Sequence, residues 1–190
     1  MRGEWCYFGS HFTKKNCEDI LQLGLTLPPS EAMVGVDGQI RTSETRKSII
    51  RFIKKEDTRF EDLFNVMWKL AIRANDDWFD LHLSKIDYIQ LAEYDASYEG
   101  KYNKHHDVFW SNDDPKYHRK LSAIVQLTDP SEYEGGNFEF FGLKEYPKKE
   151  DIRKQGTVTF FPSFLEHQLT PVTKGKRYSL ACWFDGPKWR

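Results

Sequence analysis

The chain has 190 residues, of which 39% are hydrophobic and 15% aromatic, enough for one well-packed domain and too few for us to expect two. Its 28 Lys plus Arg are balanced by 29 Asp plus Glu, so no global field favours nucleic acid or an anionic membrane as a partner. No stretch is apolar enough for a signal peptide or a membrane span, so we expect a cytoplasmic protein. The three cysteines form no CxxC pair, which argues against a disulfide framework or a thiolate zinc site.

The N-terminal part of the sequence predicts helices. Asn16 suits the N-cap of a short helix over Cys17–Leu23, which Gly24 would end. The segment after Pro28-Pro29 carries glycines and small polar residues, and this composition indicates extended chain and loop. The strongest helix signal follows, because apolar residues recur between Phe60 and Ala74 at the spacing of one helix face.

Beyond Trp78 the pattern changes to the alternation that is typical of strands. The predicted strands are 81–83, 87–91, 105–110, 120–127, 137–141, 157–161, 167–172 and 177–184. Each is short, rich in β-branched or aromatic residues, and bounded by Gly, Pro, Asp or Asn. We therefore expect a mainly β single domain over 1–190, with helical support roughly over 1–79 and a jelly-roll core roughly over 80–187, the helices packing on one outer face.

Three side chains in these strands have the character of metal ligands. If 105–110 is a strand, His105 and Asp107 point to the same face and His106 points away. His167 supplies a second imidazole. Two histidines and one carboxylate form the facial triad of non-haem Fe(II) oxygenases, which leaves the opposite face of the metal open for a co-substrate and dioxygen. We expect this site in the mouth of the predicted barrel.

A cation follows ten residues after the second histidine. The planar guanidinium of Arg177 can meet a carboxylate through two parallel hydrogen bonds, and Ser179 lies on the same face of the strand. This pair is suited to hold an acidic co-substrate beside the metal. Trp183 is interpreted as plain core packing.

The order and intervals of these residues resemble the 2-oxoglutarate and Fe(II)-dependent dioxygenases of the prolyl 4-hydroxylase type, roughly from Tyr88 to Pro187. The pattern consists of Tyr102, His105, Asp107, Gly135-Gly136, Gly156-Thr157, Phe161-Pro162-Ser163, His167, Pro171-Val172-Thr173, Gly175, Arg177, Ser179 and Trp183. The resemblance implies a double-stranded β-helix, iron held by His105, Asp107 and His167, and the C5 carboxylate of 2-oxoglutarate paired with Arg177.

The same resemblance implies further roles. Tyr94 stands near where relatives place a tyrosine that contacts the co-substrate, and Gln126 stands where some animal relatives have a tyrosine that aids carboxylate binding. The expected chemistry consumes dioxygen and 2-oxoglutarate, yields succinate and carbon dioxide, and can use ascorbate as reductant. A prolyl residue in a peptide or protein is the first choice of substrate, and another amino-acid side chain or a small molecule is the alternative.

Two other classes of function stay open at this point. A cupin-type metal enzyme that does not use 2-oxoglutarate would share the two histidines without needing Arg177 and Ser179, and an inert jelly-roll binding module would need no triad. The segment 108–119 predicts a substrate lid, in which Trp110 and Tyr117 offer flat apolar surfaces for a proline ring. The alternative is that Trp110 only closes the end of the barrel. The sequence predicts no oligomeric state.

Overall fold

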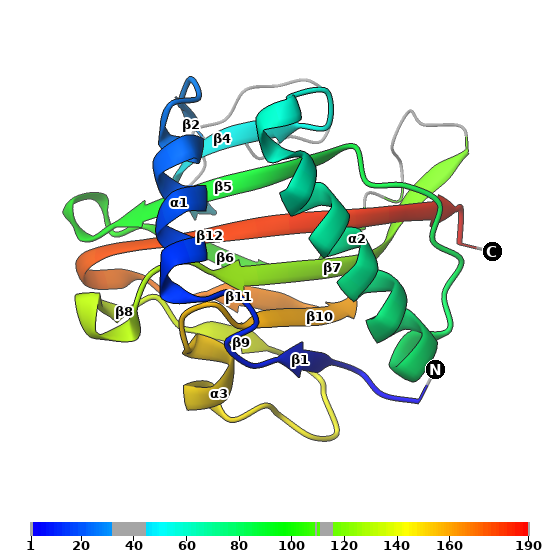
Figure 1. Ribbon diagram of the computed structural model, residues 1–190. Coiled ribbons are helices and arrows are strands. Elements are labelled where there is room, and N and C mark those ends of the chain that lie inside the picture. The colour runs from blue at the N-terminus through cyan, green and yellow to red at the C-terminus, as the bar shows by residue number, and fades with distance from the viewer. Residues whose placement is uncertain (1, 32–44, 109, 111–115, 190) are drawn as a thin grey trace.

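Two antiparallel sheets face each other in the computed structural model, which describes residues 2–31, 45–108, 110 and 116–189 (Figure 1). The large sheet has the order β1-β10-β7-β12-β5-β4-β2, with β8 paired to β12, and the small sheet has the order β3-β6-β11-β9. The prediction of a mainly β chain is therefore confirmed. The sheets do not close into a barrel, so the expected barrel mouth is replaced by the space between them.

The strands and helices have the following bounds. The large sheet contains β1 (Cys6–Phe8), β2 (Ser30–Glu31), β4 (Ile49–Lys54), β5 (Tyr88–Asp95), β7 (Tyr117–Gln126), β8 (Tyr133–Gly135), β10 (Val158–Pro162) and β12 (Val172–Pro187). The small sheet contains β3 (Arg46–Lys47), β6 (Lys101–His105), β9 (Phe138–Phe140) and β11 (His167–Leu169). The α-helices are α1 (Lys14–Leu25), α2 (Glu61–Ala74) and α3 (Lys149–Arg153). Four short helical segments are 3-10 or π-helical: η1 (Thr58–Phe60), η2 (Asn75–Phe79), η3 (Ala96–Tyr98) and η4 (Pro130–Glu132).

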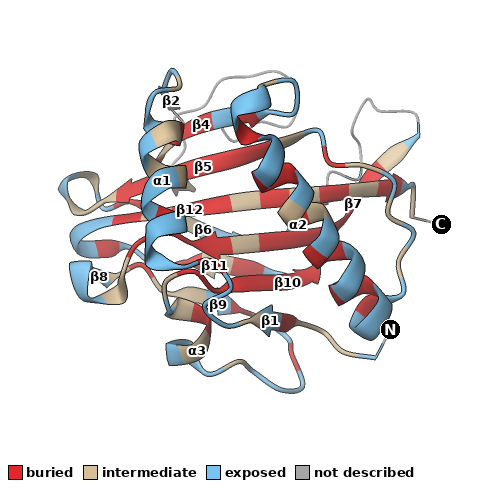
Figure 2. Ribbon diagram, in the orientation of Figure 1, coloured by how far each residue is buried: buried red, intermediate tan, exposed pale blue. Residues whose placement is uncertain are grey.

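Helices α1 and α2 cross one face of the large sheet (Figure 1); the outward side of α1 is largely exposed, and α2 carries buried segments (Figure 2). Cys17 of α1 and Met67 of α2 belong to the same core cluster as Leu91 of β5 and Leu121 of β7. The predicted helix over Phe60–Ala74 is confirmed by α2, which buries the apolar residues of that periodic face. None of the helices in the described part of the chain is long and apolar enough to cross a membrane.

Strands β5 and β12 separate the core from a cavity. Ile89 and Leu91 of β5, with Leu180 and Cys182 of β12, pack toward the helices. Since successive side chains on a strand point to opposite faces, the residues between them point toward the small sheet. There they line a cavity of about 290 Å³; these residues are Tyr88, Gln90, Ala92 and Tyr94 on β5 and Arg177, Ser179, Ala181 and Trp183 on β12.

The start of α1 differs from the prediction. Thr13, not Asn16, is the N-cap, and the helix begins at Lys14. Asn16 occupies the third helical position and completes a capping box, since its side chain accepts a hydrogen bond from the backbone N–H of Thr13 at 3.1 Å. Gly24 lies inside the helix, where an added Cβ would approach a methyl group of Leu91 to 2.7 Å. The glycine therefore allows close packing of the helix on the sheet.

The N-terminal part supplies strands as well as helices. β1 pairs with β10, and β4 pairs with β5 along its whole length. The prediction of helical support over 1–79 missed these strands. The predicted strand at 81–83 is irregular backbone, and the one at 105–110 is displaced, because β6 ends at His105.

Candidate metal centre and adjoining cavity

Three potential metal ligands converge between the sheets. His105 is the last residue of β6 and His167 the first of β11, and the two are cross-strand partners. Nε2 of His105 lies 3.7 Å from Oδ1 of Asp107, and Nε2 of His167 lies 3.7 Å from Oδ2. One donor atom from each side chain lies within 4.8 Å of the others. The predicted set is thus brought together, and its size and chemistry suit a divalent transition metal.

Backbone carbonyls fix both imidazoles. Nδ1 of His105 lies 2.8 Å from the carbonyl oxygen of Asn103, and Nδ1 of His167 lies 2.9 Å from that of Leu165. Since a carbonyl oxygen can only accept, each Nδ1 carries a hydrogen, so the lone pair of each ring in its neutral form is on Nε2. In this tautomer the nitrogen that can bind a metal is Nε2, which in both histidines faces Asp107.

Two serines hold Asp107. Its buried carboxylate accepts a hydrogen bond of 2.7 Å from the hydroxyl of Ser122 on β7, and the hydroxyls of Ser122 and Ser163 lie 2.9 Å apart. The backbone N–H of Asp107 donates to the carbonyl oxygen of Ser163 at 2.8 Å. Asp107 lies in a bend beyond the end of β6, so strand alternation was the wrong reason for expecting it beside His105. Sequence reasoning missed Ser122 because a single serine in a strand carries no distinguishing pattern.

The electrostatics of the cluster favour a bound cation. Burial, followed by the charge of His167, lowers the pKa of His105 to about 4. Burial alone would raise the pKa of Asp107, but His167, His105, Arg119 and the Ser122 hydroxyl outweigh it and hold the pKa below its ordinary value. At neutral pH the site therefore offers a neutral imidazole at His105 and an ionised carboxylate at Asp107.

Arg177 is a buried cation in the wall of the same cavity. Only 2% of its surface is exposed. Nη1 donates to the hydroxyl of Ser179 at 3.0 Å and Nη2 donates to Oε1 of Gln126 at 2.8 Å, while Nε has no hydrogen-bond partner. Within the described ranges it forms no ion pair with a carboxylate. Because a buried charge without a counter-ion is costly, this geometry calls for an acidic ligand.

The other residues predicted for co-substrate binding surround Arg177. Ser179 lines the cavity, and its hydroxyl accepts a hydrogen bond from Arg177. The side-chain oxygen of Gln126 accepts a second hydrogen bond from the guanidinium and so fixes its position. Tyr94 is the cross-strand partner of Arg177, whose guanidinium carbon lies 5.6 Å from the centre of the tyrosine ring. Tyr102 belongs to the predicted motif and lies beside the metal cluster. Its ring stacks on that of His105 with 3.5 Å between centroids.

The residues predicted to contact a substrate lie farther out. Trp110 is 54% exposed, and its ring centre lies 6.2 Å from that of His106, which borders the cavity. Tyr117 begins β7 with its ring 4.9 Å from Nζ of Lys85. Half of the predicted lid, residue 109 and residues 111–115, falls outside the described residues. Trp183 lines the cavity, so its interpretation as plain core packing was incomplete.

Sequence comparisons match the same part of the chain. A family model described as "2OG-Fe(II) oxygenase superfamily" matches residues 89–185, about half of the chain. A "PKHD-type hydroxylase" of Synechococcus sp. is 34% identical over 88 residues, which are 46% of this chain and 37% of the relative. One from Aliarcobacter butzleri is 32% identical over 92 residues, which are 45% of this chain and 38% of the relative. The chain thus spans well under half the length of these relatives.

Solved structures resemble almost the whole chain. The viral collagen prolyl hydroxylase of Paramecium bursaria Chlorella virus-1, solved with 2OG, has a TM-score of 0.69 and 20% identity, with 96% of each chain covered. A prolyl-4-hydroxylase of Pseudomonas putida has a TM-score of 0.70 and 18% identity, with 98% of this chain and 94% of that chain covered. A Trichoplax adhaerens prolyl hydroxylase, solved with a hypoxia inducible factor peptide, has a TM-score of 0.73 and 15% identity, with 96% and 83% covered. At such identities the likeness establishes the fold.

Proposed function

Because the chain belongs to the 2OG-Fe(II) oxygenase superfamily, we propose that it is an Fe(II)- and 2-oxoglutarate-dependent hydroxylase that acts on prolyl residues in a peptide or protein. The observation that carries the proposal is that the histidine–aspartate cluster and the unpaired Arg177 border one cavity. A cupin-type metal enzyme without 2-oxoglutarate would not need that buried cation. Prolyl hydroxylase structures that share the fold support the choice of substrate.

The metal cluster and the buried cation have separate parts in this reaction. His105, Asp107 and His167 would hold the iron through two Nε2 atoms and a carboxylate. When bound, iron with 2-oxoglutarate and dioxygen supplies the oxidising power for hydroxylation, with succinate and carbon dioxide as co-products and ascorbate as a reductant. Arg177 and Ser179 bind the C5 carboxylate of 2-oxoglutarate, a charge-assisted contact that orients the co-substrate.

Neighbouring side chains position that contact. Gln126 holds Nη2 of Arg177, and Tyr94 lies beside the guanidinium at the same end of the cavity. Fixing the guanidinium before the co-substrate arrives reduces the ordering that binding must impose. Trp110 and Tyr117 flank the segment 111–115 and are the proposed contacts of a peptide substrate near the exposed end of the cavity.

The proposal extends to the whole chain. We assign 1–190 to a single domain, with helices packed on the outer face of a double-stranded β-helix. A cytoplasmic setting is supported by the free cysteines Cys6, Cys17 and Cys182, which are all buried and unlinked. A peptide or protein is the proposed partner.

The test combines co-substrate turnover with product analysis. Purified protein with Fe(II) and 2-oxoglutarate should release succinate, and proline-containing peptides should gain the mass of one oxygen atom. A peptide in which proline is replaced by alanine is the control. Iron binding without any consumption of 2-oxoglutarate would contradict the proposal and favour the cupin-type chemistry.

A further inference from the structure

The cavity has two ends that differ in chemistry. β5 and β12 line the cavity with side chains from neighbouring positions. At one end lie Tyr94 and Arg177. At the other end lie Tyr88 and Trp183, and the centres of these two rings are 5.7 Å apart. Trp183 lies six positions beyond Arg177 along β12, or about 20 Å at roughly 3.3 Å per residue. The buried end holds the co-substrate in the proposed function. The aromatic end is therefore left for the substrate.

Arg46 borders the cavity from the small sheet. Its Nε donates to the hydroxyl of Ser48 at 2.9 Å, and its Nη2 donates to Oε1 of Gln90 at 2.7 Å. Its guanidinium carbon lies 4.5 Å from the centre of the Tyr102 ring, which in turn stacks on His105. These contacts fix the guanidinium beside the metal ligands. They involve neutral partners only, so the positive charge of Arg46 is not neutralised by them.

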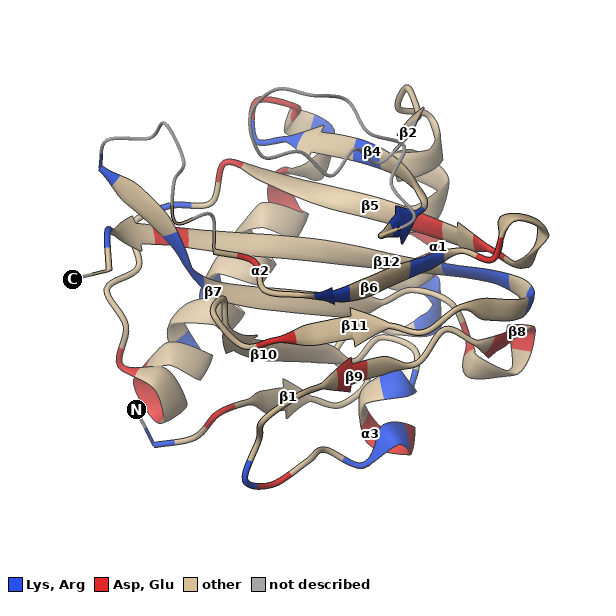
Figure 3. Cartoon of the chain, turned by 180° about the vertical axis from the view of Figure 1, so that it is seen from behind, with Lys and Arg blue, Asp and Glu red and all other residues tan. Residues whose placement is uncertain are grey.

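Arg119 borders the cavity from the large sheet. Its guanidinium carbon lies 3.9 Å from the centre of the Trp183 ring, and its Nη2 donates to the hydroxyl of Tyr88 at 2.5 Å. Nη1 donates to the backbone carbonyl of Asp107 at 3.5 Å. Arg119 is thus held at the aromatic end, close to the metal cluster. Figure 3 shows further basic residues on β6 and the first half of β7.

Among the described residues that line the cavity, acidic groups are scarce. Asp107 is the single acidic residue among the described residues that line it. Together with the two negative charges of 2-oxoglutarate, Asp107 offsets the two charges of Fe(II) and the charge of Arg177. The charge of Arg46 then has no acidic counterpart among the described residues that line the cavity, a partly enclosed space where a counter-ion is favoured more than in bulk water.

We propose that the aromatic end of the cavity is a carboxylate subsite, so that the substrate carries an acidic group next to the residue that is hydroxylated. This inference rests on the proposed function. Arg46 makes the direct bond to the carboxylate, while Tyr88 and Trp183 pack against the apolar part of the substrate. The carboxylate belongs either to an Asp or Glu side chain adjacent to the target residue or to the C-terminus of the peptide.

Matched peptides test the subsite. One peptide carries Pro-Glu with an amidated C-terminus, the second carries Pro-Gln in the same context, and the third ends in proline with a free carboxylate. Binding is measured without oxygen, in the presence of Fe(II) and 2-oxoglutarate, and hydroxylation is measured separately as kcat/KM. We expect the Pro-Glu or the free-carboxylate peptide to bind about tenfold more tightly than the Pro-Gln peptide, and whichever does so identifies the source of the carboxylate.

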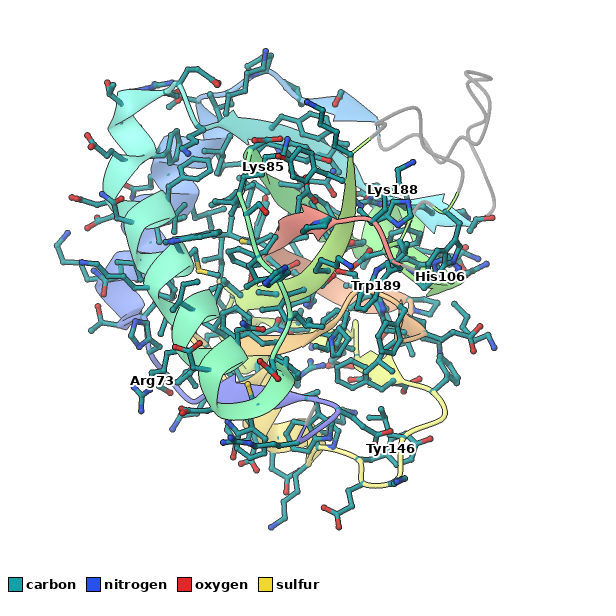
Figure 4. The ribbon with its side chains drawn as sticks, turned by 90° about the vertical axis from the view of Figure 1, so that its right-hand side faces the viewer. Arg73, Lys85, His106, Tyr146, Lys188 and Trp189 are labelled. Atoms are coloured by element: carbon teal, nitrogen blue, oxygen red, sulfur yellow. The ribbon has the colours of Figure 1, made fainter. Side chains whose placement is uncertain are left out.

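Variants test the residue that makes the bond. Arg46→Gln should remove the preference for the acidic peptide, while Arg46→Glu should favour a Pro-Lys peptide instead. Arg73→Gln is the matched control, because Arg73 also packs over an aromatic ring, with its guanidinium carbon 5.1 Å from the centre of Phe8. Figure 4 shows Arg73 and His106 on opposite sides of the molecule, so this control removes the same charge far from the cavity. Arg73→Gln should keep the full preference.

The outcomes separate the subsite from the proposed function. Equal binding of all three peptides by the unaltered protein would overturn the carboxylate subsite, even if prolyl hydroxylation were observed. A preference for the acidic peptide that survives in Arg46→Gln would also overturn the assignment. Tight, Arg46-dependent binding of the acidic peptide without a gain of oxygen would support the subsite and count against hydroxylation of proline.

Discussion

At the scale of single residues, the hydroxyl of Ser122 orients one of the proposed metal ligands. It is a hydrogen-bond donor to the buried carboxylate of Asp107, and it links that carboxylate to Ser163. Partners of this kind orient a metal ligand, and their loss typically costs about 10- to 100-fold in metal affinity. We expect Ser122→Ala to weaken Fe(II) binding by that factor in an anaerobic titration. The exposed Ser131 provides the control substitution, Ser131→Ala.

The ligands themselves should show an all-or-none response. Replacing His105, Asp107 or His167 by Ala should abolish product formation and sharply reduce iron content, because each supplies one of the three donor atoms. His106→Ala is the neighbouring control and should retain iron, since His106 lies outside the cluster. Loss of iron in His106→Ala together with full activity in His105→Ala would reverse the assignment.

Arg177 should affect the co-substrate rather than the metal. A charge-assisted hydrogen bond is worth about 1.5 to 3 kcal/mol, so Arg177→Ala should raise the 2-oxoglutarate requirement by roughly ten- to a hundredfold. Iron content is measured alongside and should change little. If Arg177→Ala reached half-maximal activity at the same 2-oxoglutarate concentration as the unaltered protein, the main support for the co-substrate assignment would be lost.

At the scale of elements, α2 stabilises the large sheet from the face opposite the cavity. Met67 is fully buried in the core that α2 shares with β5 and β7. Met67→Ala should lower the free energy of unfolding by about 2 to 5 kcal/mol, because the methionine leaves a cavity between helix and sheet. Chemical denaturation measures the change, with exposed Lys69→Ala as control. The kcat of the folded Met67→Ala protein should stay close to normal.

Elements with a clear period were predictable, and those defined by distant partners were not. The apolar face of α2 repeats along the sequence, so local reasoning could find it. The pairing of β1 with β10 depends on residues about 150 positions away and leaves little local trace. The cap of α1 was misplaced because Thr13 and Asn16 both suit an N-cap, and the capping box uses both.

The candidate site was predictable where chemistry required a particular residue type. His105, Asp107, His167 and Arg177 were identifiable by type and order, and the structure brings them to one cavity. Arg46 was not identifiable, because it comes from a two-residue edge strand that carries no pattern of its own.

At the scale of the whole molecule, the metal cluster lies where the two sheets meet. His105 and His167 belong to the small sheet, whereas Asp107 is held from the large sheet, by Ser122 of β7 and by Ser163, which directly follows β10. A metal that takes all three side chains therefore joins the sheets. The large sheet also has the helices α1 and α2 packed on it, while the small sheet consists of short strands.

Metal binding should therefore act on stability as well as on chemistry, through thermodynamic linkage. A ligand that binds only the native state stabilises it by RT ln(1 + [L]/Kd), about 2.7 kcal/mol at a concentration of 100 Kd. Removing the metal with a chelator should speed hydrogen exchange of backbone amides in β6 and β11 much more than in α2. Equal acceleration in both regions would show that the protein opens only as a unit. If the difference is found, the small sheet is a conditional part of the fold, whose order is set by the supply of iron.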